Sequence, residues 1–169
     1  MGDDADFLDG LLAEWAKACP ALDTEAFGVT TRVVRLARLI EKRLDGALAP
    51  LGLALWQFEV MSTLLPDAGG PGVQVWRLLP ASLLSPAAMT NRLDRLETAG
   101  WIERLPDAED RRATRIRLTA AGREVTLRAF AALGHADCPL ASAEAARLND
   151  SLRKILRSLC DQPSADGII

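Results

Sequence analysis

The chain is poor in the residues from which catalytic and metal sites are most often built. It has one histidine, His135, and no tyrosine, and its three cysteines, Cys19, Cys138 and Cys160, form no CxxC pair. The motifs HExxH and GxSxG are absent, and no acidic cluster has metal-ligand spacing. We therefore expect a protein that is not an enzyme, without metal or cofactor, in which His135 is a solvent-facing residue near a helix end.

The sequence contains no long apolar run, and its first residues do not have the pattern expected of a secretory leader. No stretch approaches the roughly 20 apolar residues that span a bilayer, and residues 1–9 are acidic where a leader would be basic. An odd cysteine count argues against a disulfide framework. These absences favour a cytoplasmic protein with no membrane partner. With 169 residues, of which 49% are apolar, the chain is long enough to bury one core.

The net charge of −3 does not by itself indicate a nucleic-acid partner, so the placement of the charges matters more. From Arg92 to Arg128 the chain has nine arginines, no lysine and seven acidic residues. One group of four comprises Arg111, Arg112, Arg115 and Arg117. A guanidinium group favours bidentate contacts with phosphate or guanine. A solvated surface is the alternative interpretation of this group.

Apolar periodicity predicts two helices in the first 50 residues. The first helix, over residues 7–19, has an apolar face of Phe7, Leu8, Leu11, Leu12 and Trp15. The second is much longer and ends before Pro50, with a stripe of Val29, Val33, Leu36, Ile40, Leu44 and Leu48. Such a stripe covers more surface than one small lobe can bury, which predicts packing against a second subunit. An ordinary core helix is the alternative.

The next 50 residues predict short helices separated by turns. Helices are expected over 55–65 and 73–80, and the loop between them contains a glycine run without the lysine and hydroxyl of a phosphate-binding loop. A further helix is expected over 85–99, because Ser85 suits an N-cap, Pro86 suits the first helical position and Gly100 ends the pattern.

The helix expected over 85–99 has the pattern of a groove-reading helix. Met89, Leu93 and Leu96 form its buried stripe, and the opposite side begins with small and polar residues. Small side chains permit close approach to duplex DNA, and Asn91 could bond the N6 and N7 edge of adenine. Other amphipathic surface helices share this pattern.

A hairpin and two further helices complete the predicted fold. Residues 101–105 and 114–118 alternate between apolar and polar as half-buried strands do, with a charged turn over 106–113. Thr119 then begins a helix that runs to about Gly134. Ser142 begins a last helix, with Leu148, Leu152, Ile155 and Leu159 in register.

This order of elements predicts a mainly α fold with a small β-hairpin wing, an α+β winged helix-turn-helix with a helical dimerisation lobe. We expect residues 51–122 to form the DNA-binding domain.

The stretch from Leu51 to Val125 resembles the MarR family of bacterial transcriptional regulators. The matching motifs are residues 90–97 (TNRLDRLE), 99–104 (AGWIER), Asp107, 110–112 (DRR) and 118–123 (LTAAGR). The resemblance implies a homodimer that binds a palindromic operator in double-stranded DNA, usually as a repressor. It also implies that residues 1–50 form a dimerisation and ligand lobe and that residues 123–169 add C-terminal dimerisation helices. The DNA contacts are then expected at Ser85, Ala87, Ala88, Thr90, Asn91, Arg95, Arg111 and Arg112, with the Asp110 carboxylate orienting a neighbouring arginine.

Residues 14–16 (EWA) and the segment from Gly52 to Glu59 resemble the MarR subgroup that responds to urate and related anions. This resemblance implies a ligand site made of Trp15, Glu59, Arg92 and Arg104. An indole can stack on a planar ligand, arginines can neutralise it and a carboxylate can accept a ring N–H. Glu59 departs from the subgroup's usual aspartate, which leaves other planar anions such as aromatic carboxylates open. The alternative for Trp15 is an anchor of its own helix.

Two other functions are compatible with parts of the sequence. Some MarR regulators respond to oxidation of an N-terminal cysteine, which makes Cys19 a candidate redox sensor. Its place beside Pro20, ahead of the long helix, differs from the usual position. A scaffold or dimerisation module would explain the helical ends but not the arginine-bearing hairpin.

Overall fold

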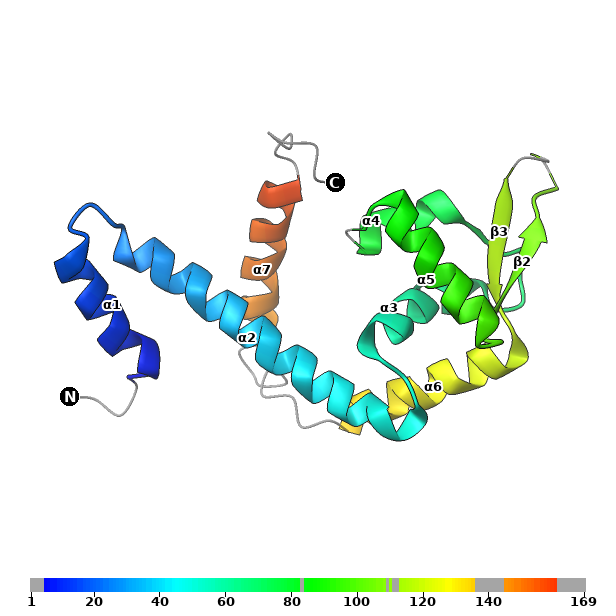
Figure 1. Ribbon diagram of the computed structural model, residues 1–169, viewed down its shortest axis with the longest axis horizontal. Helices are drawn as coiled ribbons and strands as arrows, with labels where there is room; N and C mark the ends of the chain where they lie inside the picture. The colour runs from blue at the N-terminus through cyan, green and yellow to red at the C-terminus, as the bar shows by residue number, and fades with distance from the viewer. Residues whose placement is uncertain (1–4, 83, 109, 111–112, 136–144, 161–169) are drawn as a thin grey trace. The chain divides into compact units, whose positions relative to one another are not determined.

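A computed structural model describes residues 5–82, 84–108, 110, 113–135 and 145–160. The chain divides into two compact units, Met1–Arg43 and Leu44–Ile169 (Figure 1).

The first unit is a helical hairpin of α1 (Phe7–Ala18) and most of α2 (Thr24–Leu48). Asp6 begins α1 with a capping box, since its carboxylate accepts the Leu8 N–H and its own N–H donates to the Asp9 carboxylate. Leu8 is buried, whereas Phe7, which the sequence assigned to the apolar face, is 73% exposed.

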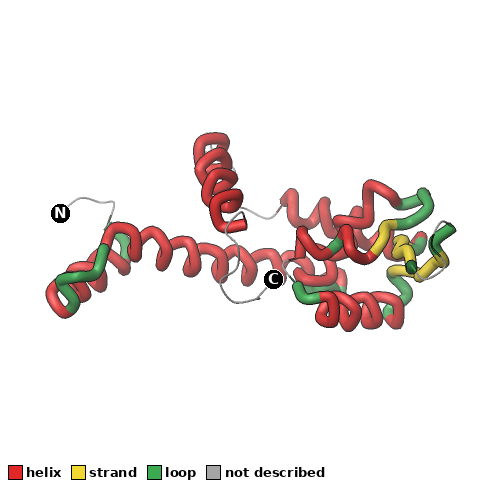
Figure 2. The backbone as a smooth tube through the Cα atoms, turned by 90° about the horizontal axis from the view of Figure 1, so that it is seen from above, coloured by secondary structure: helices red, strands yellow, loops and turns green. Residues whose placement is uncertain are grey.

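The second unit contains a three-stranded antiparallel sheet, in the order β1-β3-β2, together with helices (Figure 2). Its elements after α2 are η1 (Ala49–Leu51), α3 (Leu55–Leu64), η2 (Leu65–Asp67), β1 (Val73–Gln74), η3 (Val75–Arg77), α4 (Leu79–Ser82), α5 (Pro86–Thr98), β2 (Ile102–Pro106), β3 (Thr114–Leu118), α6 (Ala120–His135) and α7 (Ala145–Cys160).

The core of this unit joins the helices to the inner face of the sheet. Helices α3, α5 and α6 and strands β2 and β3 all contribute to one buried cluster. Its members are Leu48, Leu53, Val60, Met61, Leu64, Leu78, Met89, Leu93, Leu96, Ile102, Ile116, Leu118 and Ala129. Burial of Met89, Leu93 and Leu96 fixes which side of α5 remains exposed.

The local signals predicted for this unit are confirmed. The Ser85 hydroxyl accepts the Ala88 N–H at the start of α5, and Gly100 ends the helix with a φ of 74°, which favours glycine. The Thr119 hydroxyl accepts the Gly122 N–H at the start of α6. The predicted fold class, mainly α with a β wing, is also confirmed.

The prediction of one helix over 73–80 was wrong. Val73 and Gln74 form strand β1, which pairs with Ile116 and Arg115 of β3, and the helical part is split between η3 and α4. A two-residue strand has no periodicity of its own, and its pairing partners lie about 40 residues away in the sequence. The predicted start of the last helix at Ser142 lies outside the described residues.

No single helix within the described ranges is long and apolar enough to cross a membrane. The helical segments 24–51 and 55–67 together have the length and apolar composition of a membrane span, but the chain bends by 79° between them.

Candidate functional site

The exposed side of α5 carries most of the residues that the sequence assigned to DNA contact. Ala87, Thr90 and Asn91 are exposed and Ala88 is half-buried, while the Ser85 cap orders the first turn. The Thr90 hydroxyl donates to the Pro86 carbonyl, so its methyl group and its oxygen lone pairs are left for an outside contact. The first half of the helix therefore presents short, mostly uncharged side chains at its exposed surface.

Two arginines on the second half of α5 share one aromatic ring. The guanidinium carbons of Arg92 and Arg95 lie 5.3 Å and 4.9 Å from the ring centroid of Trp56, at the start of α3. Trp56 is half-buried and packs against the core. The cation–π contacts link α3 to the candidate reading helix, and they hold Arg95 at the edge of its exposed side.

Glu59 and Arg92, two of the four predicted ligand residues, are brought together. They line one small cavity between α3, α4 and α5, together with Thr63, Ser82 and Met89. The cavity volume is about 20 Å³, which is room for roughly one water molecule. In this form the cavity is too small for a planar anion of the size of urate.

Arg104, the third predicted ligand residue, is engaged elsewhere. On β2 it forms ion pairs with Asp94 at 2.7 Å and with Glu97 at 2.5 Å, both on α5. It does not line the cavity of Glu59 and Arg92. The pairs fasten the wing to the second half of α5, so the position of Arg104 supports a structural role.

Trp15, the fourth predicted ligand residue, lies on α1 in the first unit. It is half-buried and meets Phe27 of α2 edge to face, with ring centroids 5.4 Å apart. This contact matches the alternative interpretation, in which Trp15 anchors its own helix.

Two of the four hairpin arginines form ion pairs within the sheet, and the other two are not described by the structure. Arg111 and Arg112 lie outside the described residues. Arg115 and Arg117 hold the sheet together, since Arg117 pairs with Glu103 at 2.8 Å and Arg115 pairs with Asp107 at 2.8 Å. Of the four arginines, these two are therefore structural, and DNA contact by the wing stays a prediction for the other two.

Asp107 organises the base of the wing. It is 3% exposed and accepts hydrogen bonds from Gln74 Nε2 at 2.7 Å and Arg115 Nε at 2.8 Å. Its Oδ1 also accepts the Asp110 N–H at 3.3 Å, and its own N–H donates to the Ala113 carbonyl. One buried carboxylate thus joins β1, β3 and the turn of the hairpin.

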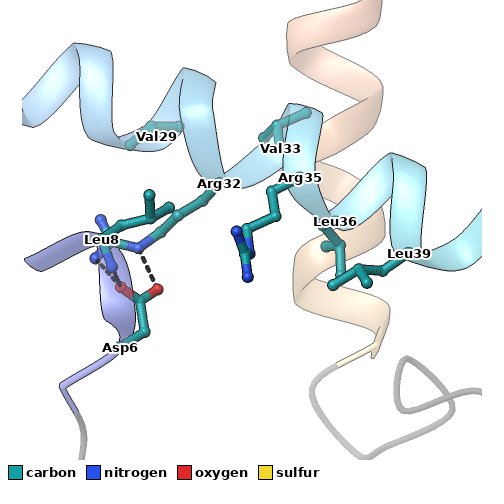
Figure 3. A pocket seen from close by; sticks show the side chains of 8 residues that line it. All are labelled: Asp6, Leu8, Val29, Arg32, Val33, Arg35, Leu36 and Leu39. Atoms are coloured by element: carbon teal, nitrogen blue, oxygen red, sulfur yellow. Dashed lines mark hydrogen bonds and ion pairs between the residues drawn. The ribbon is translucent and has the colours of Figure 1, made fainter. Parts of the chain in front are cut away.

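The first unit has an apolar groove between α1 and α2 with a volume of about 410 Å³ (Figure 3). Its floor consists of Leu8, Val29, Val33, Leu36 and Leu39. Arg32 pairs with Asp6 at 2.9 Å and Asp9 at 2.7 Å at one end. The Asp6 pKa is lowered, chiefly because its carboxylate accepts hydrogen bonds from Arg32. Arg35 lies over the Phe7 ring, 5.7 Å from its centroid.

Two further expectations concern cysteine and metal. Cys19 is exposed and is not in a disulfide, and its N–H donates to the Trp15 carbonyl at the end of α1. Cys138 and the side chains of Cys160 and His135 lie outside the description. No group of three potential metal ligands occurs in the described part of the chain.

Trp56 and Gln74 are site residues that sequence reasoning missed. Trp56 lies one helical turn before Glu59, so the i, i+3 spacing places both on the α3 side that faces α5. Gln74 had no such signal, because its contact with Asp107 depends on the pairing of β1 with β3.

Comparisons with known proteins agree on one family. Residues 56–114 match the model of the MarR family. The chain is 31% identical to the HTH-type transcriptional regulator PecS of Dickeya dadantii over 112 residues, which cover 66% of this chain and 68% of PecS. It is 30% identical to the multiple antibiotic resistance protein MarR of Escherichia coli over 136 residues, 73% of this chain and 92% of MarR.

A solved structure of a mutant of E. coli MarR, complexed with operator DNA, has a similar fold. The TM-score is 0.69 at 23% identity, with 90% of this chain and 99% of that chain covered.

Proposed function

The chain belongs to the MarR family of transcriptional regulators, and from this premise we propose that it is a ligand-responsive repressor that binds a palindromic operator as a homodimer. In this proposal residues 51–122 form the DNA-binding domain, and residues 1–50 and 123–169 supply the dimerisation helices. A small planar anion, such as urate or an aromatic acid, releases the protein from the operator.

The observation that carries the proposal is the exposed first half of α5. Its small and polar residues stand on a helix whose opposite face is locked into the core by Met89, Leu93 and Leu96. Asn91 is exposed and its side-chain amide has no hydrogen-bond partner within the described residues, so it is available to a base edge. E. coli MarR, a relative of this chain, has been crystallised as a mutant with operator DNA.

The wing supports the proposal through its base. Asp107, just after β2, pairs with Arg115 of β3, and in the sequence Arg111 and Arg112 follow Asp110 between the two strands. In a winged helix, arginines between the two wing strands can reach the minor groove and its phosphates.

Exposed apolar side chains on two of the described helices support the dimer. Helix α2 exposes Val29, Val33, Val34, Leu36 and Leu39. Helix α7 exposes Leu148, Leu152, Ile155, Leu156 and Leu159 along one stripe. Apolar faces of this extent on separate helices are typical of obligate interfaces, and we assign them to a second copy of this chain.

The effector site is proposed at Glu59 and Arg92. An anion that pairs with Arg92 has to widen the small cavity and draw the guanidinium away from Trp56, and Arg92 belongs to the reading helix. Ligand binding would then be coupled to the position of α5, and DNA would oppose ligand binding by the same factor.

The test is a DNA titration with the full-length protein and a duplex obtained by in vitro selection from a randomised pool. We expect sequence-specific binding that weakens with salt and is reduced by a planar anion. The double variant Arg111→Ala, Arg112→Ala should lose affinity and keep its circular dichroism spectrum. Binding that ignores both salt and sequence would rule out the proposal.

A single-residue test separates base reading from phosphate binding. Asn91→Ala should lose about 1–3 kcal/mol of preference for the selected duplex while its affinity for scrambled DNA stays unchanged. Thr98→Ala, at an exposed position in the last turn of the same helix, is the matched control. An equal effect of the two variants would mean that Asn91 does not read a base.

A further inference from the structure

Trp76 is the feature that the proposed function leaves unexplained. It is 61% exposed on η3, and no other large apolar side chain is exposed within the described residues from 48 to 118. Leaving an indole exposed to water is less favourable than burying it. Exposed aromatic residues that are held in place are characteristic of recognition surfaces.

The Trp76 ring is held by a chain of side-chain hydrogen bonds that ends inside the wing. Its Nε1 donates to Gln74 Oε1 at 2.8 Å, and Gln74 Nε2 donates to Asp107 Oδ2 at 2.7 Å. Arg115 donates to the same carboxylate oxygen. Because Gln74 also pairs with Arg115 across the sheet, the indole is fixed to the frame that carries the wing.

A cation accompanies the exposed ring. The guanidinium carbon of Arg77 lies 5.3 Å from the Trp76 ring centroid, and Arg77 has no ion-pair partner in the described part of the chain. The Trp76 ring therefore offers a flat apolar surface, and the Arg77 guanidinium beside it offers a positive charge.

The place of this pair in the fold indicates its partner. η3 and α4 precede α5 as the first helical arm of the helix-turn-helix, and in that motif the first helix crosses the DNA backbone while the second enters the major groove. We propose that Trp76 and Arg77 form a contact with the sugar-phosphate backbone of duplex DNA, Arg77 with a phosphate and the Trp76 ring against the adjoining deoxyribose. This inference rests on the proposed function.

The proposed contact has two consequences. It is independent of sequence, since phosphate and sugar are the same at every base pair. It also links the backbone position of the protein to the wing, because the Gln74–Asp107–Arg115 chain joins the two.

The experiment measures the affinity of the full-length protein for the selected duplex and for a scrambled duplex over a range of salt concentrations. Arg77→Ala should weaken both complexes by the same factor and make the slope of log K against log salt shallower by about 1. Arg128→Ala, at an exposed arginine on α6 with no ion-pair partner among the described residues, is the matched control and should keep the slope.

Tryptophan variants test the ring. Trp76→Ala should weaken binding more than about fivefold with little change in slope, and Trp76→Phe should retain part of the affinity. The change in tryptophan fluorescence on DNA addition should be reduced in Trp76→Phe, which also serves if Trp76→Ala does not fold.

Failure of this inference can be told from failure of the proposed function. If the wild type binds the selected duplex while the Arg77 and Trp76 variants match the Arg128 control, only the backbone contact is overturned. It is also overturned if Trp76→Ala alters self-association in sedimentation without changing DNA affinity. If the wild type selects no duplex, the proposed function falls and this inference falls with it.

Discussion

Asp107 is a buried carboxylate at the end of β2, and we expect it to stabilise the pairing of the wing strands. Asp107 neutralises Arg115 and accepts hydrogen bonds from two other parts of the second unit. Asp107→Ala removes the carboxylate that accepts from Gln74 and Arg115, and leaves the Arg115 guanidinium with its hydrogen bond to the Gly72 carbonyl. Because the Arg115 side chain is 23% exposed, water compensates in part, and we expect a loss of stability of about 3 kcal/mol or somewhat less.

Denaturant unfolding of the full-length chain measures this loss. Glu103→Ala is the control, because Glu103 pairs with Arg117 on the same hairpin and both side chains are partly exposed, so less than about 1 kcal/mol should be lost. Equal losses for the two variants would contradict the special role assigned to Asp107.

At the scale of elements, α6 can begin where it does because Gly122 has no side chain. A Cβ at this position would overlap the Trp101 carbonyl oxygen, a backbone atom that cannot rotate away. That carbonyl also accepts the Thr119 N–H, and this hydrogen bond holds it in place. Gly122→Ala should therefore push α6 away from the start of β2 and lower stability by about 1–3 kcal/mol.

The same helix provides the control for this change. A Cβ at Gly134 would meet nothing within 4 Å, so Gly134→Ala should be neutral or stabilising by up to about 1 kcal/mol. The measurement is the melting temperature of both variants. An unchanged melting temperature for Gly122→Ala would contradict the prediction, because it would mean that the overlap with the Trp101 carbonyl is relieved without loss of stability.

The attachment of α1 to α2 should depend on acid pH. Arg32 donates hydrogen bonds to Asp6, which lowers the pKa of that carboxyl below its ordinary value. A lowered folded-state pKa means that the pair contributes fully above the unfolded pKa and that its contribution is lost as the pH falls through the folded pKa. The loss should therefore occur below about pH 4.

Trp15 reports on this attachment because its ring contacts Phe27 of α2. A variant in which only Trp15 remains as tryptophan should show an emission change in this acid range. Asp6→Asn removes the titrating carboxyl and weakens the attachment at every pH, so it should flatten that change. Both side chains are exposed, so added salt should reduce the effect. A pH profile that is identical in the two proteins would contradict the assignment.

The elements were predictable from sequence where the signal is local. The Ser85-Pro86 start of α5, the Gly100 stop and the alternation in 101–105 and 114–118 act within a few residues, and they predicted the helix and hairpin. Strand β1 was missed because it exists only through pairing with β3.

For the site residues, too, local roles could be predicted from the sequence and roles that depend on long-range contacts could not. A run of arginines does not reveal which of them face Asp107 or Glu103, and the ion pairs of Arg104 join elements that only the fold brings together.

At the scale of the whole molecule, the exposed apolar faces should make the isolated chain associate. Helix α2 shows Leu36 at 39% and Leu39 at 52% exposure, whereas the core of the second unit is complete without them. A charge placed there should thus leave each chain folded and disrupt only contacts with a second copy. Leu36→Glu combined with Leu39→Glu is the change that tests this.

We expect the double variant to sediment as a monomer where the wild type sediments as a dimer, with an unchanged helical circular dichroism signal. A dimer reads two half-sites about one helical turn apart, so the variant should bind an intact palindrome no better than a single half-site. Val75→Ala, a conservative change within the second unit, controls for a general loss of stability. A double variant that remains a dimer would place the interface on other residues, with the stripe of α7 as the next surface to change.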